Sequence, residues 1–228
     1  MNFKTFFWSS LFAVSMGFFE SAVVIYLREI AYPGGFSFPI HTLSQNLSAT
    51  EILREGFSII MLISVSCLIG KRGIDRFGWF IYNFAIWDIF YYVFLYLLIG
   101  WPDSLFTFDL LFLIPVIWTG PVLAPVLLSI LMIFLAVLII TYSKRIRYLR
   151  FRGKELIFLV AGSLICLYSF TIDYIRFSKG KPFSDFTQYQ PEKFNWYVFG
   201  TGFLLILTGI LMFLFFNKKS KKKKESRH

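Results

Sequence analysis

The stretch GWFIYNFAIWDIFYYVFLYLLIG, residues 78–100, decides the fold of this chain. It is an almost unbroken apolar run, and about 20 such residues suffice for a helix to cross a bilayer. Near its middle lies one acid, Asp88, and the phenols Tyr91 and Tyr92 follow it at i+3 and i+4. Those offsets place both phenols on the acid's side of a helix. Because a carboxylate at that depth costs about 2.5–3.5 kcal/mol, Asp88 is expected to face protein or water rather than lipid.

The overall composition is that of a polytopic membrane protein. Of 228 residues, 57% are hydrophobic and 16% are charged, whereas soluble domains carry about 25% charged residues. The mean hydropathy is +0.67. The net charge of +10 does not indicate nucleic-acid binding, because the basic residues cluster in short runs beside apolar segments. Such runs orient membrane helices and attract anionic lipid headgroups.

Six apolar segments predict an all-α integral membrane protein with six transmembrane helices. The expected spans are residues 6–27, 50–70, 77–100, 121–142, 156–175 and 196–216. We expect residues 1–217 to form one transmembrane domain. The basic tail, residues 218–228, is expected to be disordered and to contact anionic headgroups.

The distribution of Lys and Arg predicts the orientation. Segments 71–76, 144–154 and 218–228 carry three, six and seven basic residues, whereas segments 31–49 and 101–120 carry none. Since basic loops stay cytoplasmic, both termini are expected in the cytoplasm. The four basic residues in segment 176–195 are an exception to this pattern. A bacterial inner membrane is the default location.

The outer loop before the fourth span is apolar but too short to cross a bilayer. Residues 110–118 read LLFLIPVIW, and Gly120 and Pro121 follow, a pair that breaks a helix. We expect a re-entrant or interfacial half-helix over residues 104–114; the alternative is one long kinked helix. Because broken segments at membrane depth line cavities, Pro115, Gly120 and Pro121 are candidate lid or gate residues.

Ionisable residues gather in the outer halves of the predicted spans. A ligand-binding site or proton path is expected to comprise Asp88, Glu20, Arg54, Glu55, Tyr91 and Tyr92. Such intramembrane groups mark functional sites, although they also pair with one another to join helices. An ion pair between Glu20 and the second span is therefore an equal alternative.

Two further structural interpretations remain open. Ser48 and Glu51 have the spacing of a capping box, which would make Glu51 a helix-capping residue. Asp88 would be protonated and hydrogen-bonded to a tyrosine, because burial disfavours the ionised carboxylate.

Three functions fit this pattern. The first is binding or transport of a small polar or cationic solute, or a proton, in an outward-facing cavity. The second is an intramembrane enzyme acting on a lipid or isoprenoid, with Asp88 and Glu55 as acid and base and with Arg54 or Arg28 holding an anionic group. The third is a membrane scaffold or assembly factor. With two histidines in the chain and no phosphate-binding or hydrolase motif, we predict no metal and no cofactor.

Overall fold

A computed structural model describes residues 3–39, 44–114, 116–144, 146, 149–179 and 189–225, with backbone alone beyond residue 217. The elements in chain order are α1 (Phe3–Ala31), α2 (Gln45–Ile69), α3 (Gly73–Ile99), β1 (Phe108–Phe112), β2 (Trp118–Pro121), α4 (Leu123–Ser143), α5 (Gly153–Ser178) and α6 (Trp196–Glu225). All six described helices are long and apolar enough to cross a membrane. The prediction of a multi-pass helical membrane protein is thereby confirmed.

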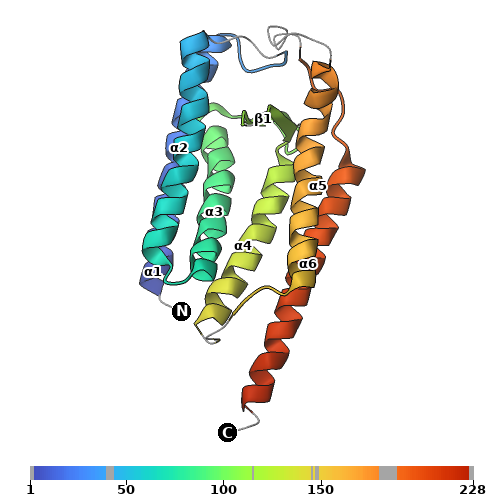
Figure 1. The fold of residues 1–228 in the computed structure, drawn as a ribbon. Helices are drawn as coiled ribbons and strands as arrows, with labels where there is room; N and C mark the ends of the chain where they lie inside the picture. Colours follow the sequence, from blue (N-terminus) through green and yellow to red (C-terminus); the bar gives the residue numbers. More distant parts are fainter. Residues whose placement is uncertain are drawn as a thin grey trace.

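Both termini lie at one end of the helical bundle (Figure 1). The short connections from α2 to α3 and from α4 to α5 lie at this end as well, and we call it the terminal end. The opposite end carries the β1–β2 hairpin, and we call it the hairpin end. The helices run between the two ends, so each helix has one half near the hairpin.

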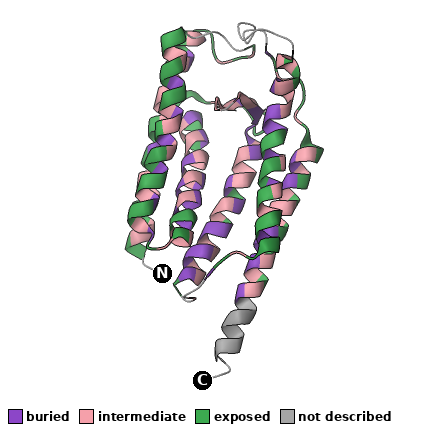
Figure 2. Cartoon of the chain, viewed as in Figure 1, coloured by how far each residue is buried: buried purple, intermediate pink, exposed green. Residues whose placement is uncertain are grey.

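The helices form two groups. In the first group α3 packs on α1, α2 and α4, and in the second α5 and α6 form a close pair (Figure 1). Contact between α4 and α6 connects the groups. Figure 2 shows exposed residues along the outer surfaces of the helices. Many of them are large and apolar, including Phe19, Leu68 and Ile157, as expected of surfaces that face lipid.

Glycines allow close approach at several helix interfaces. A Cβ atom added at Gly202 of α6 would lie 2.6 Å from the Sγ of Cys166 and 2.7 Å from the carbonyl oxygen of Gly162, both on α5. A Cβ at Gly78 of α3 would lie 2.8 Å from Ile139 of α4. Small residues at such positions bring helix backbones into the van der Waals contact that drives association in lipid.

Buried polar side chains join the helices near the terminal end. Ser9 of α1 donates to Asn83 of α3 at 2.6 Å, and the Asn83 amide donates to Ser66 of α2 at 3.4 Å. Arg72, just before α3, donates to the Ser143 hydroxyl of α4 at 2.7 Å. Hydrogen bonds between helices are favoured where no water competes, so this end of the bundle is held together on both sides of α3.

The structure has a β-hairpin where the sequence predicted a half-helix over residues 104–114. Strands β1 and β2 are antiparallel, with Phe108 opposite Pro121 and Asp109 opposite Gly120. A short apolar run lacks the periodicity that distinguishes a strand from a helix, and strand pairing satisfies its backbone polar groups equally well. The predicted break before the fourth span is confirmed, since α4 begins only at Leu123.

The helices extend beyond most of the expected spans, and two of these extensions change an interpretation made from the sequence. Helix α2 begins at Gln45 with Ser44 as its N-cap, so the capping-box interpretation of Ser48 and Glu51 is wrong. Helix α6 continues to Glu225, into the segment expected to be disordered. Both differences have one cause: hydropathy marks the part of a helix that lies in lipid, and the helix itself extends beyond that part.

Candidate functional site

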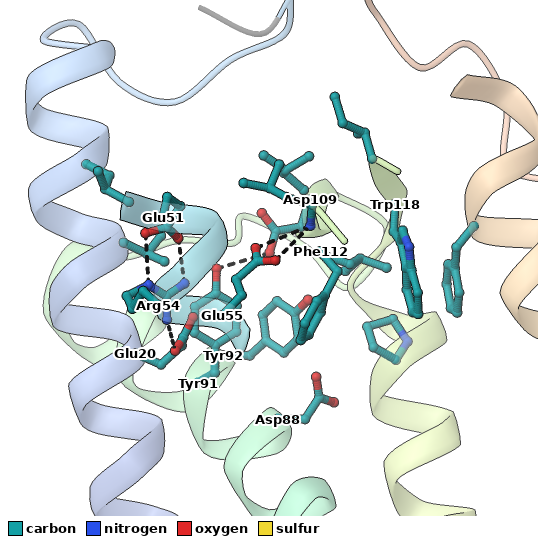
Figure 3. A pocket seen from close by; sticks show the side chains of 18 of the residues that line it. Glu20, Glu51, Arg54, Glu55, Asp88, Tyr91, Tyr92, Asp109, Phe112 and Trp118 are labelled. Carbon is teal, nitrogen blue, oxygen red and sulfur yellow. Dashed lines mark hydrogen bonds and ion pairs between the residues drawn. The ribbon is translucent and has the colours of Figure 1, made fainter. Parts of the chain in front are cut away.

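A cavity of about 500 Å³ lies within the helical bundle, at the level of the hairpin. Its wall is built from the hairpin-end halves of α1 to α5 and from both strands, and Figure 3 shows the side chains that surround it. The volume falls within the about 300–1,000 Å³ of small-molecule sites. All six site residues predicted from the sequence line this cavity: Glu20, Arg54, Glu55, Asp88, Tyr91 and Tyr92.

Arg54 is held between two acids on the α1 and α2 side of the cavity (Figure 3). It pairs with Glu20 of α1 and with Glu51 one turn away on α2, and its Nε lies 2.8 Å from Oε2 of Glu51. The predicted ion pair between Glu20 and the second helix is therefore present. The three side chains are only 10–17% exposed. All three nitrogens of the guanidinium group bind carboxylate oxygens.

Arg28 and Asp109 form a second buried ion pair under the hairpin. Nη2 of Arg28 lies 3.1 Å from Oδ1 of Asp109, and the guanidinium lies over the rings of Phe36 and Trp101, 4.3 Å and 3.8 Å from their centroids. Tyr91 donates to the second oxygen of Asp109 at 3.3 Å. Burial raises the pKa of the Asp109 carboxyl above its ordinary value, and the charge of Arg28 opposes that rise.

Asp109 was not among the predicted site residues. Its exposed fraction is 1% because the hairpin folds it against α1 and α3. The available signal was a lone acid next to apolar residues, as it was for Asp88.

Glu55 connects α2 to the hairpin. Its two carboxylate oxygens accept the backbone N–H of Leu113 at 3.0 Å and 3.2 Å, just beyond the end of β1. Glu55 is buried, and it forms no ion pair with any residue that the structure describes. It is thus a buried acid whose carboxylate binds one backbone N–H and pairs with no cation among the described residues.

Asp88 lies deepest in the cavity view, below the tyrosines and the hairpin (Figure 3). Its Oδ2 accepts a hydrogen bond from Ser129 of α4 at 2.8 Å. The expected tyrosine partner is therefore wrong, because the phenol of Tyr91 reaches the hairpin instead. Asp88 is partly exposed because it faces the cavity, and within the described ranges it forms no ion pair.

The described cavity wall carries five carboxyl groups and two guanidinium groups. Both guanidinium groups pair with acids, which leaves Glu55 and Asp88 without a basic partner among the described residues. The described wall therefore has more carboxyl groups than basic groups to neutralise them. This arrangement suits a proton or a cation.

Aromatic rings form a continuous wall from α3 across the hairpin to α5. The Phe112 ring lies 6.3 Å from that of Trp87 and 5.6 Å from that of Trp118, and Trp118 stacks on Phe170 at 6.5 Å. We call these four residues the aromatic wall. It gives the cavity a large apolar surface beside its acids.

The predicted lid residues have different positions. Gly120 and Pro121 belong to β2, and a Cβ atom at Gly120 would lie 2.9 Å from the ring of Phe170, so this strand is packed firmly on α5. Pro115 lies outside the described residues. The cavity contacts of the hairpin come from Asp109 to Leu113 and from Val116 to Trp118.

Comparison with known proteins gave no relative: no family model, curated protein or solved structure matches this chain. Among the described residues, no three His, Cys, Asp or Glu side chains are grouped so as to hold a metal ion. What the site can do is therefore argued from its own geometry.

Proposed function

We propose that this protein binds or transports a small polar or cationic solute, or a proton, in the cavity within its helical bundle. The observation that carries the proposal is a pair of acids on the wall of one cavity, the half-buried Asp88 and the buried Glu55, neither of which has a basic partner among the described residues. An uncompensated acid inside a membrane protein is costly and is retained where it binds or exchanges charge. Glu20 and Arg54 line the path, and Tyr91 joins α3 to the hairpin.

The hairpin end faces away from the cytoplasm in this proposal, and both termini lie inside. The support is the location of the basic connections and the C-terminal tail at the terminal end (Figure 1) together with the retention of basic loops in the cytoplasm. A bacterial inner membrane fits this arrangement. The cavity then opens to the outer side.

The orientation is tested by cysteine labelling in intact cells. Ser104 at the hairpin end and Lys71 at the terminal end are both exposed, and each is changed to Cys in a background carrying Cys67→Ala and Cys166→Ala. A membrane-impermeant maleimide is expected to label the Ser104→Cys variant in intact cells and the Lys71→Cys variant only after permeabilisation. The opposite pattern would show that the chain is inserted the other way.

The first testable consequence for activity concerns Asp88. In proteoliposomes loaded with a pH-sensitive dye, an imposed membrane potential is expected to drive proton entry through the parent protein. Asp88→Asn keeps the size of the side chain but removes its charge, and we expect at least an about tenfold lower rate, typical of losing a proton-transfer group. The measurement is the initial rate of dye acidification, repeated with sodium and with choline as candidate solutes.

Asp103→Asn is the matched control, because Asp103 is an exposed acid outside the cavity. It is expected to retain the parent rate. Ser129→Ala removes the hydrogen bond to Asp88 but keeps the acid, and we expect a partial loss. Equal rates for the parent and Asp88→Asn, with every solute tested, would remove Asp88 from the proposed path.

The alternative of a lipid-phosphate enzyme is less well supported by the same geometry. That function needs a basic group to hold the phosphate, and Arg28 and Arg54 are both engaged by carboxylates. An anionic substrate would have to displace one of those carboxylates, whereas a cation would neutralise the acids that have no partner.

A further inference from the structure

We infer that the ligand of this cavity is an organic cation with an apolar body, an amine or quaternary ammonium compound, rather than an inorganic ion or an anion. The inference rests on the proposed function and narrows it to one class of solute. It follows from three features of the cavity: its arginines are already paired with acids, three of its acids bind different donors, and its wall is rich in aromatic rings.

The basic residues argue against an anion. Arg54 pairs with both Glu20 and Glu51, and Arg28 lies over two rings with one nitrogen bonded to Asp109. Another nitrogen of Arg28, Nη1, has no hydrogen-bond partner among the described residues, but neighbouring atoms cover it. The same holds for the indole N–H groups of Trp87 and Trp118. An anion entering the cavity would thus meet carboxylates, and the two described basic groups on the wall are already engaged.

The separation of the acids argues against a hard inorganic cation. Calcium and magnesium need about six or more oxygen ligands, several of them from carboxylates or water. Here three acids bind three different donors: Glu20 binds Arg54, Glu55 binds the N–H of Leu113, and Asp88 binds Ser129. These three acids are therefore not grouped around one ion site. One carboxylate suffices for a single ammonium group, which needs only local neutralisation.

The aromatic wall argues for an organic body. A cation within about 6 Å of an aromatic centroid is attracted to the face of the ring, and Trp is the strongest such partner. This protein already stabilises a cation in that way, since Arg28 lies over Phe36 and Trp101. Trp87, Phe112, Trp118 and Phe170 offer further ring surface in the cavity, and a ligand with its own apolar groups would cover it.

These features place the ligand in one orientation. The charged nitrogen lies near Asp88, which is the deepest acid in Figure 3 and is partly exposed to the cavity. The apolar body extends along the aromatic wall toward the hairpin. Glu55, bonded to the N–H of Leu113, supplies a second acid on the same cavity wall.

The test compares three aromatic probes, two of which have the same shape, on the full-length protein in lipid nanodiscs. They are benzyltrimethylammonium, its uncharged carbon analogue neopentylbenzene, and the anion benzoate. Calorimetric titration is expected to give saturable binding of benzyltrimethylammonium, with neopentylbenzene and benzoate weaker by about tenfold or more, as expected when one buried charge pair decides affinity.

Two variants then distinguish the contribution of the acid's charge to binding from that of the aromatic wall. Asp88→Asn is expected to weaken benzyltrimethylammonium binding by about tenfold or more while leaving neopentylbenzene unchanged. Phe112→Leu removes a central ring of the aromatic wall, and both probes should weaken several-fold. Asp103→Asn should bind all three probes like the parent. A thermal unfolding midpoint close to the parent value establishes that each variant is folded, and Asp88→Glu should recover part of the cation binding.

Each other result has a definite meaning. Benzoate or neopentylbenzene binding as tightly as the cation, or cation binding that Asp88→Asn leaves intact, would overturn the inferred ligand class. If benzyltrimethylammonium does not bind but proton entry still depends on Asp88, the ligand class is wrong and the proposed function holds with the proton as solute. If neither binding nor Asp88-dependent movement occurs, both are wrong.

Discussion

Arg54→Met is expected to lower the thermal stability of this protein severely. Arg54 is the shared ion-pair partner of Glu20 and Glu51, and all three side chains are largely buried. Removing it leaves two carboxylates close together without their cation, and breaking a buried ion pair in this way costs about 3–5 kcal/mol. On the scaling for soluble chains of this length, that corresponds to about 6–20 °C in the unfolding midpoint. Tryptophan fluorescence of the detergent-solubilised protein during heating measures the change.

The origin of the loss is tested by removing the acids as well. Glu20→Gln and Glu51→Gln added to Arg54→Met eliminate the uncompensated charges, and replacement of a whole buried ion cluster is often close to neutral. We expect this triple variant to regain most of the parent's midpoint. Arg176→Met, at an exposed position of α5, should leave the midpoint unchanged. An Arg54→Met protein as stable as its parent would mean that the cluster contributes nothing to the fold.

The sequence was sufficient to predict the six spans and the gathering of charged residues on one side. The reason is energetic: a helix in lipid must be apolar for about 20 residues, so exceptions such as Glu20, Arg54 and Asp88 are conspicuous, and they must find partners or water inside the protein. The pairing of Glu20 with Arg54 follows from the same cost, since intramembrane charges usually pair with one another.

The hydrogen-bond partner of Asp88 and the burial of Asp109 could not be predicted from the sequence. Ser129 is a neutral residue in an apolar span, and nothing in its neighbours distinguishes it from a residue that bonds to its own helix. Asp109 is buried only because residues 108–121 fold as a hairpin against α1 and α3. Local pattern cannot distinguish strand from helix in so short an apolar run. The contacts that depend on the hairpin therefore could not be predicted either.

The second large effect is expected at the interface of α5 and α6. Gly202→Leu would place a Cβ atom 2.6–2.8 Å from the Sγ and backbone nitrogen of Cys166 and from the carbonyl oxygen of Gly162. Two of these three atoms are backbone, so no rotamer change on α5 can make room, and the helices must separate. Overpacking of this kind costs about 1–3 kcal/mol and more where backbone must move. We expect a drop of at least about 6 °C in the unfolding midpoint, measured as for Arg54.

Gly200→Leu provides the matched control two residues away on the same helix, because a Cβ atom at Gly200 meets nothing within 4 Å. Helix propensity and hydrophobicity change identically in the two variants, so a difference between them reports the contact with α5 alone. Since lipid tails are as apolar as leucine, α5 and α6 gain no hydrophobic drive to associate and depend on close packing. Equal midpoints for Gly202→Leu and Gly200→Leu would therefore contradict the arrangement of these two helices, and with it the position of Phe170 in the aromatic wall.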